Sequence, residues 1–418
     1  MLKECFKVHR KKMFELMEDD SLLLAFSRRK EDSITNERYN VDRNYFYLCG
    51  VLEFDNVVVL KKVNGECKEL IYINPYDEFK AKWVGAPYSK EKVAELSGID
   101  MSNIEYLNNL KGDTQYFLSQ VNTVYLDFDL DNTNDDVLTP TEEMAKRIRE
   151  KMPWMNIRNS RDLFKECRMI KHQEEIDEMK KAIHITRLGI ENILNNMKES
   201  YEYQLESFFD QAIKYNGATG YAFPTIAASG KNATCLHYSD NNCIAKDGDL
   251  ILFDLGCSVN MYCSDISRTF PVNGKFTERQ KQLYNIVLEA QEKVLKAAKP
   301  GLTIKDLQKI VVKHFEEKLM EIGLIKEPSE VSKYYYHGVS HNIGLDCHDL
   351  SDHFAKLRAG QIISNEPGLY IAEEGIGIRI EDDILITEDG AVCLSNEILK
   401  TVEDIEEFMR KRQWIRKY

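Results

Sequence analysis

Three short and largely apolar runs in the second half of the chain each end in a carboxylate. Asp254, Glu366 and Glu381 directly follow the runs LILF, IISN and GIRI. Runs of this length and composition are typical of buried strands. An ionised carboxylate is costly to bury unless it is paired or binds a metal ion. The repeated placement of acids at strand ends therefore predicts a cation site.

Other residues of the same kind accompany these three acids. Asp265 stands eleven residues after Asp254, and the segment 337–349 contains three histidines and two aspartates. A single acid after a strand more often begins a turn or caps a helix. Four acids together with a histidine-rich segment favour metal binding over that interpretation.

The length and composition of the chain limit its organisation and its partners. At 418 residues it exceeds the size at which one hydrophobic core keeps growing, so two domains are expected and one long domain is the alternative. Pro153 breaks a helical stretch, and we predict domains at 1–158 and 159–418. The net charge of −13, without a long block of Lys and Arg, argues against a nucleic-acid partner.

The beginning of the chain carries no pattern of an export signal or a membrane span. Residues 1–20 mix Lys, Arg, Glu and Asp, and the nearest apolar run, 22–26, has five residues. The ten cysteines contain no C-x-x-C pair, which argues against a zinc ribbon and a disulfide framework. Thiols in such a chain are typical of a reducing compartment. We therefore expect a cytoplasmic protein with no membrane partner.

The first half of the chain has the pattern of a small α/β domain. A charged amphipathic segment at 4–17 predicts a helix, and short apolar runs predict strands. The acidic stretch 127–136 has no apolar period and predicts a loop. It does not fit an EF-hand calcium loop, because Asn132 occupies the position where that loop needs glycine. The predicted strands are 22–26, 45–48, 57–60 and 70–73.

The second half of the chain has helical patterns between short strands, which makes the whole an α+β protein. Apolar periodicity predicts helices at 172–198 and 307–319. Thr277 and Gln280 form a capping-box pattern ahead of a further helix, which ends before Pro300. The predicted strands are 250–253, 362–364, 376–380 and 384–386.

A series of motifs follows in a fixed order through residues 172–405. They are FPTI at 223–226, SGKNA at 229–233, LHY at 236–238, FDLG at 253–256, YCSDISRT at 262–269, the segment 337–349, NEPGLY at 365–370 and GIRIED at 377–382. This part of the chain resembles the creatinase/aminopeptidase P/prolidase family, whose catalytic domain has the pita-bread fold. Residues 42–50 are similar, more loosely, to that family's smaller N-terminal α/β domain.

The resemblance implies a ligand set for two divalent ions. Asp254 would chelate one ion, Asp265 and Glu381 would bridge both, and His341 and Glu366 would complete the second. Oxygen ligands with a single imidazole and no thiolate suit hard or borderline ions, so Mn²⁺ is the first choice and Co²⁺ or Zn²⁺ are alternatives. Four carboxylates balance two divalent cations, which favours two ions over one.

The resemblance also implies roles around the metal ions. Glu366 would act as general base and proton shuttle for a hydroxide that bridges the ions, and His348 would stabilise the oxyanion. His237 and His337 would lie around the substrate. Taken alone, each of the three histidines at 237, 337 and 348 is better explained as a structural residue, but their occurrence together with the ligand motifs favours a role at the substrate. Tyr370 and Arg379 would orient Asp254.

The histidine pair at 337 and 341 does not fit the helical zinc-peptidase motif, because Gly338 stands where that motif needs glutamate. The resemblance implies an Xaa-Pro aminopeptidase that acts on peptides with proline at the second position, as a homodimer or homotetramer. A prolidase limited to Xaa-Pro dipeptides is the main alternative. Methionine aminopeptidase lacks so long an N-terminal region, and creatinase lacks the metal ligands. A non-catalytic binding protein of the same fold is the alternative from another class.

Overall fold

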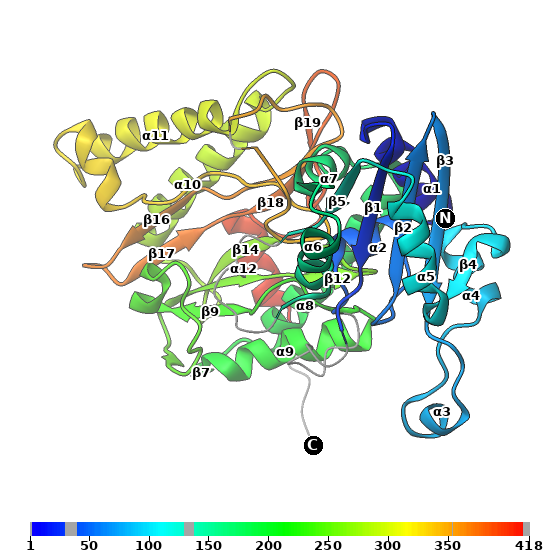
Figure 1. Ribbon diagram of the computed structural model, residues 1–418. Helices are drawn as coiled ribbons and strands as arrows, with labels where there is room; N and C mark the ends of the chain where they lie inside the picture. Colours follow the sequence, from blue (N-terminus) through cyan, green and yellow to red (C-terminus); the bar gives the residue numbers. More distant parts are fainter. Residues whose placement is uncertain (1, 30–39, 129–137, 353, 413–418) are drawn as a thin grey trace. The chain divides into compact units, whose positions relative to one another are not determined.

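The computed structural model describes residues 2–29, 40–128, 138–352 and 354–412. The chain forms two compact units, Met1–Arg168 and Met169–Tyr418 (Figure 1). The predicted division after residue 158 falls inside β6, ahead of α7. Because β6 pairs with β5 and α7 packs against α1, both elements belong to the first unit.

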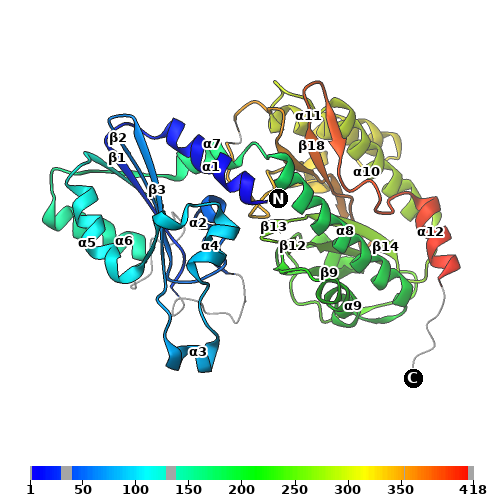
Figure 2. The ribbon, with the colours of Figure 1, turned by 90° about the vertical axis from the view of Figure 1, so that its right-hand side faces the viewer.

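The first unit is built on a six-stranded sheet in the order β4-β3-β2-β1-β5-β6 (Figure 2). β1 and β2 are antiparallel, whereas β5 pairs parallel to β1, so the sheet is mixed. The strands are β1 (Ser21–Phe26), β2 (Val57–Val63), β3 (Glu66–Ile73), β4 (Ile104–Tyr106), β5 (Thr123–Leu126) and β6 (Asn156–Asn159). The helices are α1 (Leu2–Leu16), α2 (Arg43–Cys49), α3 (Glu78–Val84), α4 (Lys90–Ser97), α5 (Leu107–Leu118), α6 (Pro140–Lys151) and α7 (Arg161–Arg168).

The segment 45–48, predicted as a strand, is helical and lies inside α2. Its aromatic residues favour a strand locally, but both ends of the segment carry helix caps. The side chain of Asp42 accepts a hydrogen bond from the Tyr45 N–H, and Gly50 ends the helix in the left-handed conformation at φ 68°. The prediction of a strand was therefore wrong, because the caps and burial of the whole segment outweigh β propensity.

Helix α3 differs from the other helices of this unit because it buries none of its side chains. Phe79 and Trp83 are 71% and 76% exposed, and their rings lie 6.2 Å apart. Figures 1 and 2 show the helix at the tip of a long excursion of the chain. An exposed apolar pair of this kind is typical of an interaction surface.

The second unit combines short antiparallel sheets with long helices, and the helices predicted at 172–198, after Thr277 and at 307–319 are confirmed as α8, α10 and α11. α8 packs against α9, and α10 packs against α11. The helices are α8 (Gln173–Asn196), α9 (Glu202–Tyr215), α10 (Glu278–Ala297), α11 (Ile304–Glu321) and α12 (Val402–Lys411). The strands are β7 (Ser200–Tyr201), β8 (Gly220–Tyr221), β9 (Ile226–Ser229), β10 (Ile244–Ala245), β11 (Leu250–Leu255), β12 (Cys257–Val259), β13 (Tyr262–Cys263), β14 (Ile266–Pro271), β15 (Ile362–Asn365), β16 (Gly368–Ile371), β17 (Ile376–Arg379), β18 (Asp382–Ile386) and β19 (Ala391–Cys393).

Strand pairing in the second unit brings distant acids together. β11 lies between β14 and β9, with Asp254 opposite Ser267 and Ile226. β15 pairs with β18, which places Asn365 opposite Asp382 and so brings Glu366 near Glu381. One large apolar cluster from α8 to α12 supports these sheets. The strands predicted at 250–253, 362–364, 376–380 and 384–386 are confirmed, with β17 ending one residue earlier than expected.

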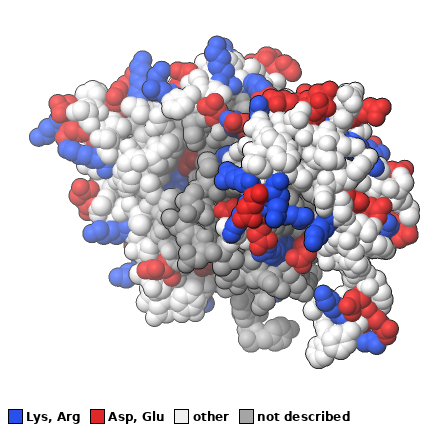
Figure 3. All heavy atoms as spheres, viewed as in Figure 1, with Lys and Arg blue, Asp and Glu red and all other residues white. Residues whose placement is uncertain are grey.

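The surface carries charges of both signs. On the face shown in Figure 3, Lys and Arg side chains lie interspersed with Asp and Glu. Most of the predicted acidic loop at 127–136 lies outside the described residues. Within the part of the chain that the structure describes, every helix is too short or too polar to cross a membrane.

Candidate metal centre

Asp254 and Asp265 lie on, and directly beside, two paired strands of the second unit. Asp254 is in β11, and Asp265 directly precedes β14, which pairs with β11. Asp265 is 4% exposed, and its backbone N–H donates to Asp383 Oδ2 at 3.3 Å. The two carboxylates therefore enter the site from a rigid, hydrogen-bonded sheet.

His341 faces the same site from the loop before β15. Its backbone N–H donates to Ser364 Oγ at 2.9 Å, which fixes the residue to β15. Its ring Nδ1 lies 3.1 Å from the carbonyl oxygen of Asn342. A proton on Nδ1 satisfies that contact and leaves Nε2 to the site, as a metal ligand requires. Nε2 lies 3.3 Å from Asp265 Oδ2, 3.6 Å from Glu366 Oε1 and 4.0 Å from Glu381 Oε1.

Glu366 directly follows β15, and Glu381 stands two residues after the end of β17. Glu366 Oε1 accepts a hydrogen bond from Ser364 Oγ at 3.2 Å, and the Glu366 N–H donates to the Val339 carbonyl at 3.0 Å. Glu381 Oε2 accepts from Ser267 Oγ at 2.8 Å. Glu381 thus keeps Oε2 on a protein donor and directs Oε1 toward His341, whereas Glu366 Oε1 lies near both Ser364 Oγ and His341 Nε2.

The donor atoms of these residues are better placed to bind a shared cation than to form hydrogen bonds with one another. Single atoms of Asp265, His341 and Glu381 all lie within 4.8 Å of one another. Asp254 Oδ1 is buried without a hydrogen-bond partner among the described residues. Oxygen-rich ligation with one imidazole suits divalent ions such as Mn²⁺. The residues that the structure places here therefore fit a metal centre.

The protein alone does not balance the charge of these acids. Burial raises the pKa of Glu366 to about 7, and the charges of Asp265 and Asp254 add to the effect. Burial, with Asp265 and Glu366 nearby, holds the pKa of Glu381 well above its usual range. Burial lowers the pKa of His341, but hydrogen bonding to Asp265 and its charge outweigh burial and raise it to about 9. These acids repel one another until a cation compensates them.

A chain of hydrogen bonds joins Asp254 to His337. Arg379 Nη2 donates to Asp254 Oδ2 at 2.6 Å, and Arg379 Nη1 donates to Tyr370 Oη at 3.0 Å. Tyr370 Oη lies 2.8 Å from His337 Nε2, and His337 Nδ1 lies 2.7 Å from the Gly338 carbonyl. The second contact requires a proton on Nδ1, so Tyr370 donates to Nε2. Burial and the Arg379 charge lower the pKa of His337 to about 4, so this ring is neutral.

The predicted site residues line one cavity of about 880 Å³, except Tyr370, which lies behind it. His237 and His348 are exposed in this cavity, on different loops. The ring centroids of His348 and His341 lie 4.0 Å apart. Phe223, Pro224, Ile226 and Leu236 add an apolar wall. The structure thus brings together all five predicted ligands and the three other predicted histidines.

Several residues that complete the site were not predicted. Ser267 donates to Glu381 and accepts from Arg379 Nε at 2.7 Å. Cys347 Sγ donates to Asp265 Oδ2 at 2.8 Å. Buried Asp383 accepts from the Asp265 backbone. Each of these residues lies inside or next to a quoted motif, but only the fold reveals the partner that it contacts.

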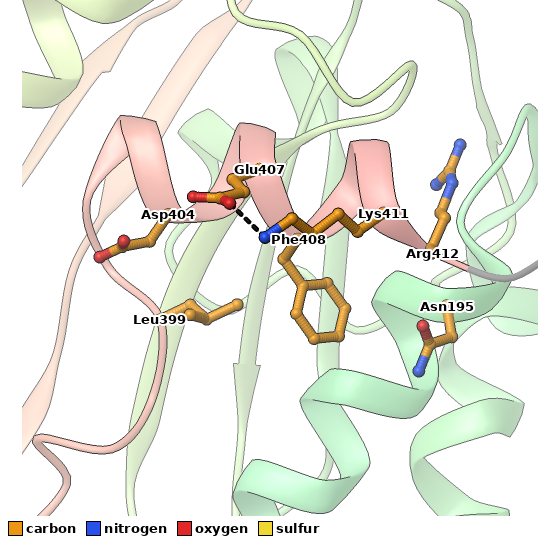
Figure 4. Close-up of a pocket in the computed structure, with 7 residues that line it drawn as sticks. All are labelled: Asn195, Leu399, Asp404, Glu407, Phe408, Lys411 and Arg412. Atoms are coloured by element: carbon orange, nitrogen blue, oxygen red, sulfur yellow. Dashed lines mark ion pairs between the residues drawn. The ribbon is translucent and has the colours of Figure 1, made fainter.

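A second cavity, of about 600 Å³, lies between α8 and α12 (Figure 4). Its charges are satisfied within the protein, since Glu407 pairs with Lys411 and Arg412 Nη1 donates to the Met197 carbonyl at 2.7 Å. None of the predicted ligands lines it. The five predicted ligands therefore line the other cavity, which contains Asp254 and His341.

Two family models match the chain, and each falls within one of the two units. Residues 177–388 match the metallopeptidase family M24, and residues 6–125 match the aminopeptidase P N-terminal domain. The first match spans the whole candidate metal centre. The fold and the site together define a metallopeptidase with the pita-bread fold.

Relatives match both units along nearly their whole length. An Xaa-Pro aminopeptidase of Escherichia coli is 32% identical over 97% of both chains, and one of Haemophilus influenzae is 31% identical over 97% of both. The structure of aminopeptidase P from E. coli with the inhibitor Pro-Leu superposes with a TM-score of 0.88 at 29% identity, covering 98% of both chains. A solved structure from Bacillus anthracis gives 0.94 at 40% identity over 99% of both. The chain belongs to the aminopeptidase P family of M24 metallopeptidases.

Proposed function

We propose that this protein is an Xaa-Pro aminopeptidase, which removes the first residue from peptides with proline at the second position. The observation that carries the proposal is the convergence of Asp254, Asp265, His341, Glu366 and Glu381 in one cavity. Relatives that match 97% of the chain are named Xaa-Pro aminopeptidases, which supports the same reading.

Two divalent ions complete the proposed site. Asp254 would hold one ion, His341 and Glu366 the other, and Asp265 and Glu381 would contact both. Mn²⁺ is our first choice, with Co²⁺ and Zn²⁺ as alternatives, and a Zn-substituted form of the E. coli relative has been solved with product. Bound ions of this kind lower the pKa of water and polarise a carbonyl group.

The residues of the chain supply proton transfer and orientation. Glu366 is the proposed general base, because its carboxylate lies in the cavity, 3.6 Å from His341 Nε2, where it can accept and return a proton. Arg379 fixes Asp254 through a 2.6 Å ion pair, so that Asp254 Oδ1 remains available for binding. His348, exposed beside His341, is the proposed partner of the developing oxyanion.

Proline changes what a peptidase can recognise. The nitrogen of an Xaa-Pro bond carries no hydrogen and its ring fixes φ, so enzymes that bind that N–H exclude it. The carbonyl group remains available for attack. We propose that His237 and His337, with the apolar wall of Phe223 and Leu236, form the pocket for the proline ring.

A prolidase, which cleaves only Xaa-Pro dipeptides, is the second candidate because the same ligand set serves both reactions. The Mn²⁺-loaded protein is to be supplied with an Xaa-Pro dipeptide, an Xaa-Pro-Yaa tripeptide and a matched Xaa-Ala-Yaa tripeptide. We expect release of the first residue from the Xaa-Pro-Yaa tripeptide, with the alanine peptide as the control for proline selectivity. Cleavage of the dipeptide alone would identify a prolidase, and cleavage of none of them would refute both functions.

We also propose that the protein self-associates, as a homodimer or homotetramer, in the cytoplasm. The exposed Phe79 and Trp83 of α3 are the apolar surface that supports self-association. Ten cysteines outside any disulfide support a reducing compartment. Sedimentation of the intact protein and of Trp83→Ser distinguishes an oligomer that uses α3 from a monomer, which would contradict the proposal.

A further inference from the structure

Glu202, the first residue of α9, is a completely buried acid that the proposed chemistry does not use. Its side chain is 0% exposed and lies at the point where β9, the turn η3 (Gly230–Thr234) and the loop from Cys235 to Cys243 meet. That loop carries His237, which lines the metal cavity. A buried carboxylate needs hydrogen-bond donors to compensate its charge, and the donors around Glu202 show which segments of the chain it fixes in place.

Five hydrogen bonds converge on this carboxylate. Oε1 accepts from the Ser229 N–H at 2.7 Å, from Ser229 Oγ at 2.6 Å and from Asn232 Nδ2 at 3.1 Å. Oε2 accepts from Tyr238 Oη at 2.8 Å and from the Cys243 N–H at 2.9 Å. The Glu202 N–H also donates to the Cys243 carbonyl at 2.9 Å. One side chain thus fixes the segment before the His237 loop, Tyr238 within the loop and the loop's end at Cys243.

The arrangement requires a carboxylate and does not accept an amide. A hydroxyl group can turn and become an acceptor, but a backbone N–H cannot. One backbone donor faces each oxygen, Ser229 on Oε1 and Cys243 on Oε2. In either orientation, the NH₂ group of a glutamine would therefore point at a backbone N–H. The hydrogen bonds also hold the pKa of Glu202 below its usual value, although burial opposes this.

The two segments that Glu202 fixes, η3 and the 235–243 loop, are each connected to the metal site. Tyr238 is the neighbour of His237, so its bond to Glu202 orients the loop beside the cavity. Asn232 belongs to η3, whose backbone touches β17 so closely that a Cβ on Gly377 would lie 2.2 Å from the Ala233 carbonyl oxygen. β17 ends at Arg379, which binds Asp254. His237 is the nearer target, because Tyr238 connects it to the carboxylate directly.

We propose that Glu202 is a positioning residue for substrate binding, and that it acts by holding the 235–243 loop so that His237 faces the cavity. The inference rests on the proposed function, in which His237 contacts the substrate. Glu202 itself lines no part of the cavity and touches no proposed metal ligand. Its loss therefore weakens substrate binding and leaves metal binding intact.

The test compares Glu202→Gln with His237→Ala in the Mn²⁺-loaded protein. Loss of a positioning contact reduces kcat/KM by roughly 10-fold. We expect Glu202→Gln to show this loss mainly as an increase in KM, with the same kcat-to-KM pattern as His237→Ala. Because both substitutions disturb one contact, the double variant is expected to be no worse than the more damaged single variant. Metal content, measured by elemental analysis, should remain that of the unmodified protein.

Hydrogen exchange tests the inference independently of activity. In Glu202→Gln, the amides of residues 229–243 should exchange faster while those of α10 and α11 stay protected. This result would stand even if no peptide were cleaved, so failure of the proposed function and failure of this inference remain distinguishable. Uniformly faster exchange would mean that Glu202 is only a structural residue, and unchanged exchange in 229–243 would equally overturn the proposal.

Three further variants complete the design. Glu202→Asp keeps the carboxylate and should recover part of the lost kcat/KM. Tyr238→Phe removes only the donor next to His237, and it serves if Glu202→Gln does not fold; it should raise KM in the same direction. Glu199→Gln is the matched control, because Glu199 is exposed and accepts one hydrogen bond, from the Asp247 N–H. An increase of KM in Glu199→Gln equal to that in Glu202→Gln, or full additivity with His237→Ala, would contradict the proposal.

Discussion

Strands β1 and β14 are equally long and almost equally buried, yet they bury different chemistry. β1 in the first unit is Ser-Leu-Leu-Leu-Ala-Phe, and β14 in the second unit is Ile-Ser-Arg-Thr-Phe-Pro. Leu24 in β1 packs among other apolar side chains, including Val59 and Leu126. Arg268 in β14 is 0% exposed and pairs with Asp382 at 2.6 Å.

The contrast shows how differently the two sheets are stabilised. Apolar burial is non-directional and proportional to area, so β1 tolerates small rearrangements. Every polar group in β14 depends on a particular partner, such as Glu381 for Ser267 and Asp382 for Arg268. A network of this kind is stable only when it is complete. The polar residues of the second unit are therefore harder to replace than the apolar residues of β1, and their network holds acids where a cation can bind them.

The largest effect is expected at the most crowded acid. Glu366→Gln keeps the shape of the side chain but removes the proposed base, so kcat for an Xaa-Pro-Yaa peptide should fall roughly 10²- to 10⁴-fold. Its thermal stability should be unchanged or higher, because one of several repelling acids is gone. Exposed Glu373→Gln is the control. Near-normal turnover in Glu366→Gln would remove its assigned role.

Breaking the charged network beside β14 should be the next largest effect. Asp382 is buried and accepts hydrogen bonds from Arg268, Ser395 and Lys400 at 2.6, 2.7 and 2.8 Å. Asp382→Asn leaves Arg268 uncompensated, which costs about 3–5 kcal/mol of unfolding free energy. Denaturant unfolding measures the loss, with exposed Asp389→Asn as the control. A loss equal to that of Asp389→Asn would show that the network is dispensable.

Removing apolar contact from β1 should cost less and should act on stability alone. Leu24 is 1% exposed, and Leu24→Ala leaves a cavity that costs about 2–5 kcal/mol. The kcat of the protein that remains folded should equal that of the unmodified protein. Leu16→Ala, at an exposed position on α1, is the control. A changed kcat in folded Leu24→Ala would mean that the sheet of the first unit takes part in the chemistry.

The strands of the second unit, and the gathering of its candidate ligands in one place, could be predicted from the sequence for a physical reason. Acids that end apolar runs are rare without compensation, so Asp254, Glu366 and Glu381 were conspicuous in the sequence. The motifs then indicated Asp265 and His341, and the structure places all five in one cavity. Their individual roles as ligands and catalysts remain predictions.

What the sequence did not predict falls into two kinds: one wrong secondary-structure element and several contacts between residues remote in sequence. The strand predicted at 45–48 failed because aromatic residues favour a strand, whereas the caps at Asp42 and Gly50 set a helix. The contacts of Glu202, Cys347 and Asp382 could not be predicted, because their partners are remote in sequence and become neighbours only after folding. Cys347, for example, stands 82 positions from Asp265.

The smallest effect concerns the pH dependence of the metal-free protein. Acids with a pKa raised by folding bind more protons in the folded state, so they reduce stability as pH rises. Burial raises the pKa of Glu366 from 4.5 to about 7, so this residue reduces the stability of the folded protein as pH rises between those two values. The pKa of His341 is raised from 6.5 to about 9. Its contribution to the stability of the folded protein is therefore complete below pH 6.5 and is lost as pH rises to about 9. Stability of the chelator-treated protein should therefore fall from about pH 5 to about pH 9.

Added Mn²⁺ should reverse this trend, because it binds the ionised ligands and its affinity rises as they lose protons. Free metal at 100 times its Kd adds about 2.7 kcal/mol to the unfolding free energy. Thermal unfolding with and without Mn²⁺ across the pH range measures the difference, and Glu366→Gln should flatten the decline below pH 7. A metal-free protein that became more stable from pH 5 to pH 9 would show that these acids are compensated without a cation. The second unit would then need no bound ion for its stability, just as the apolar sheet of the first unit needs none.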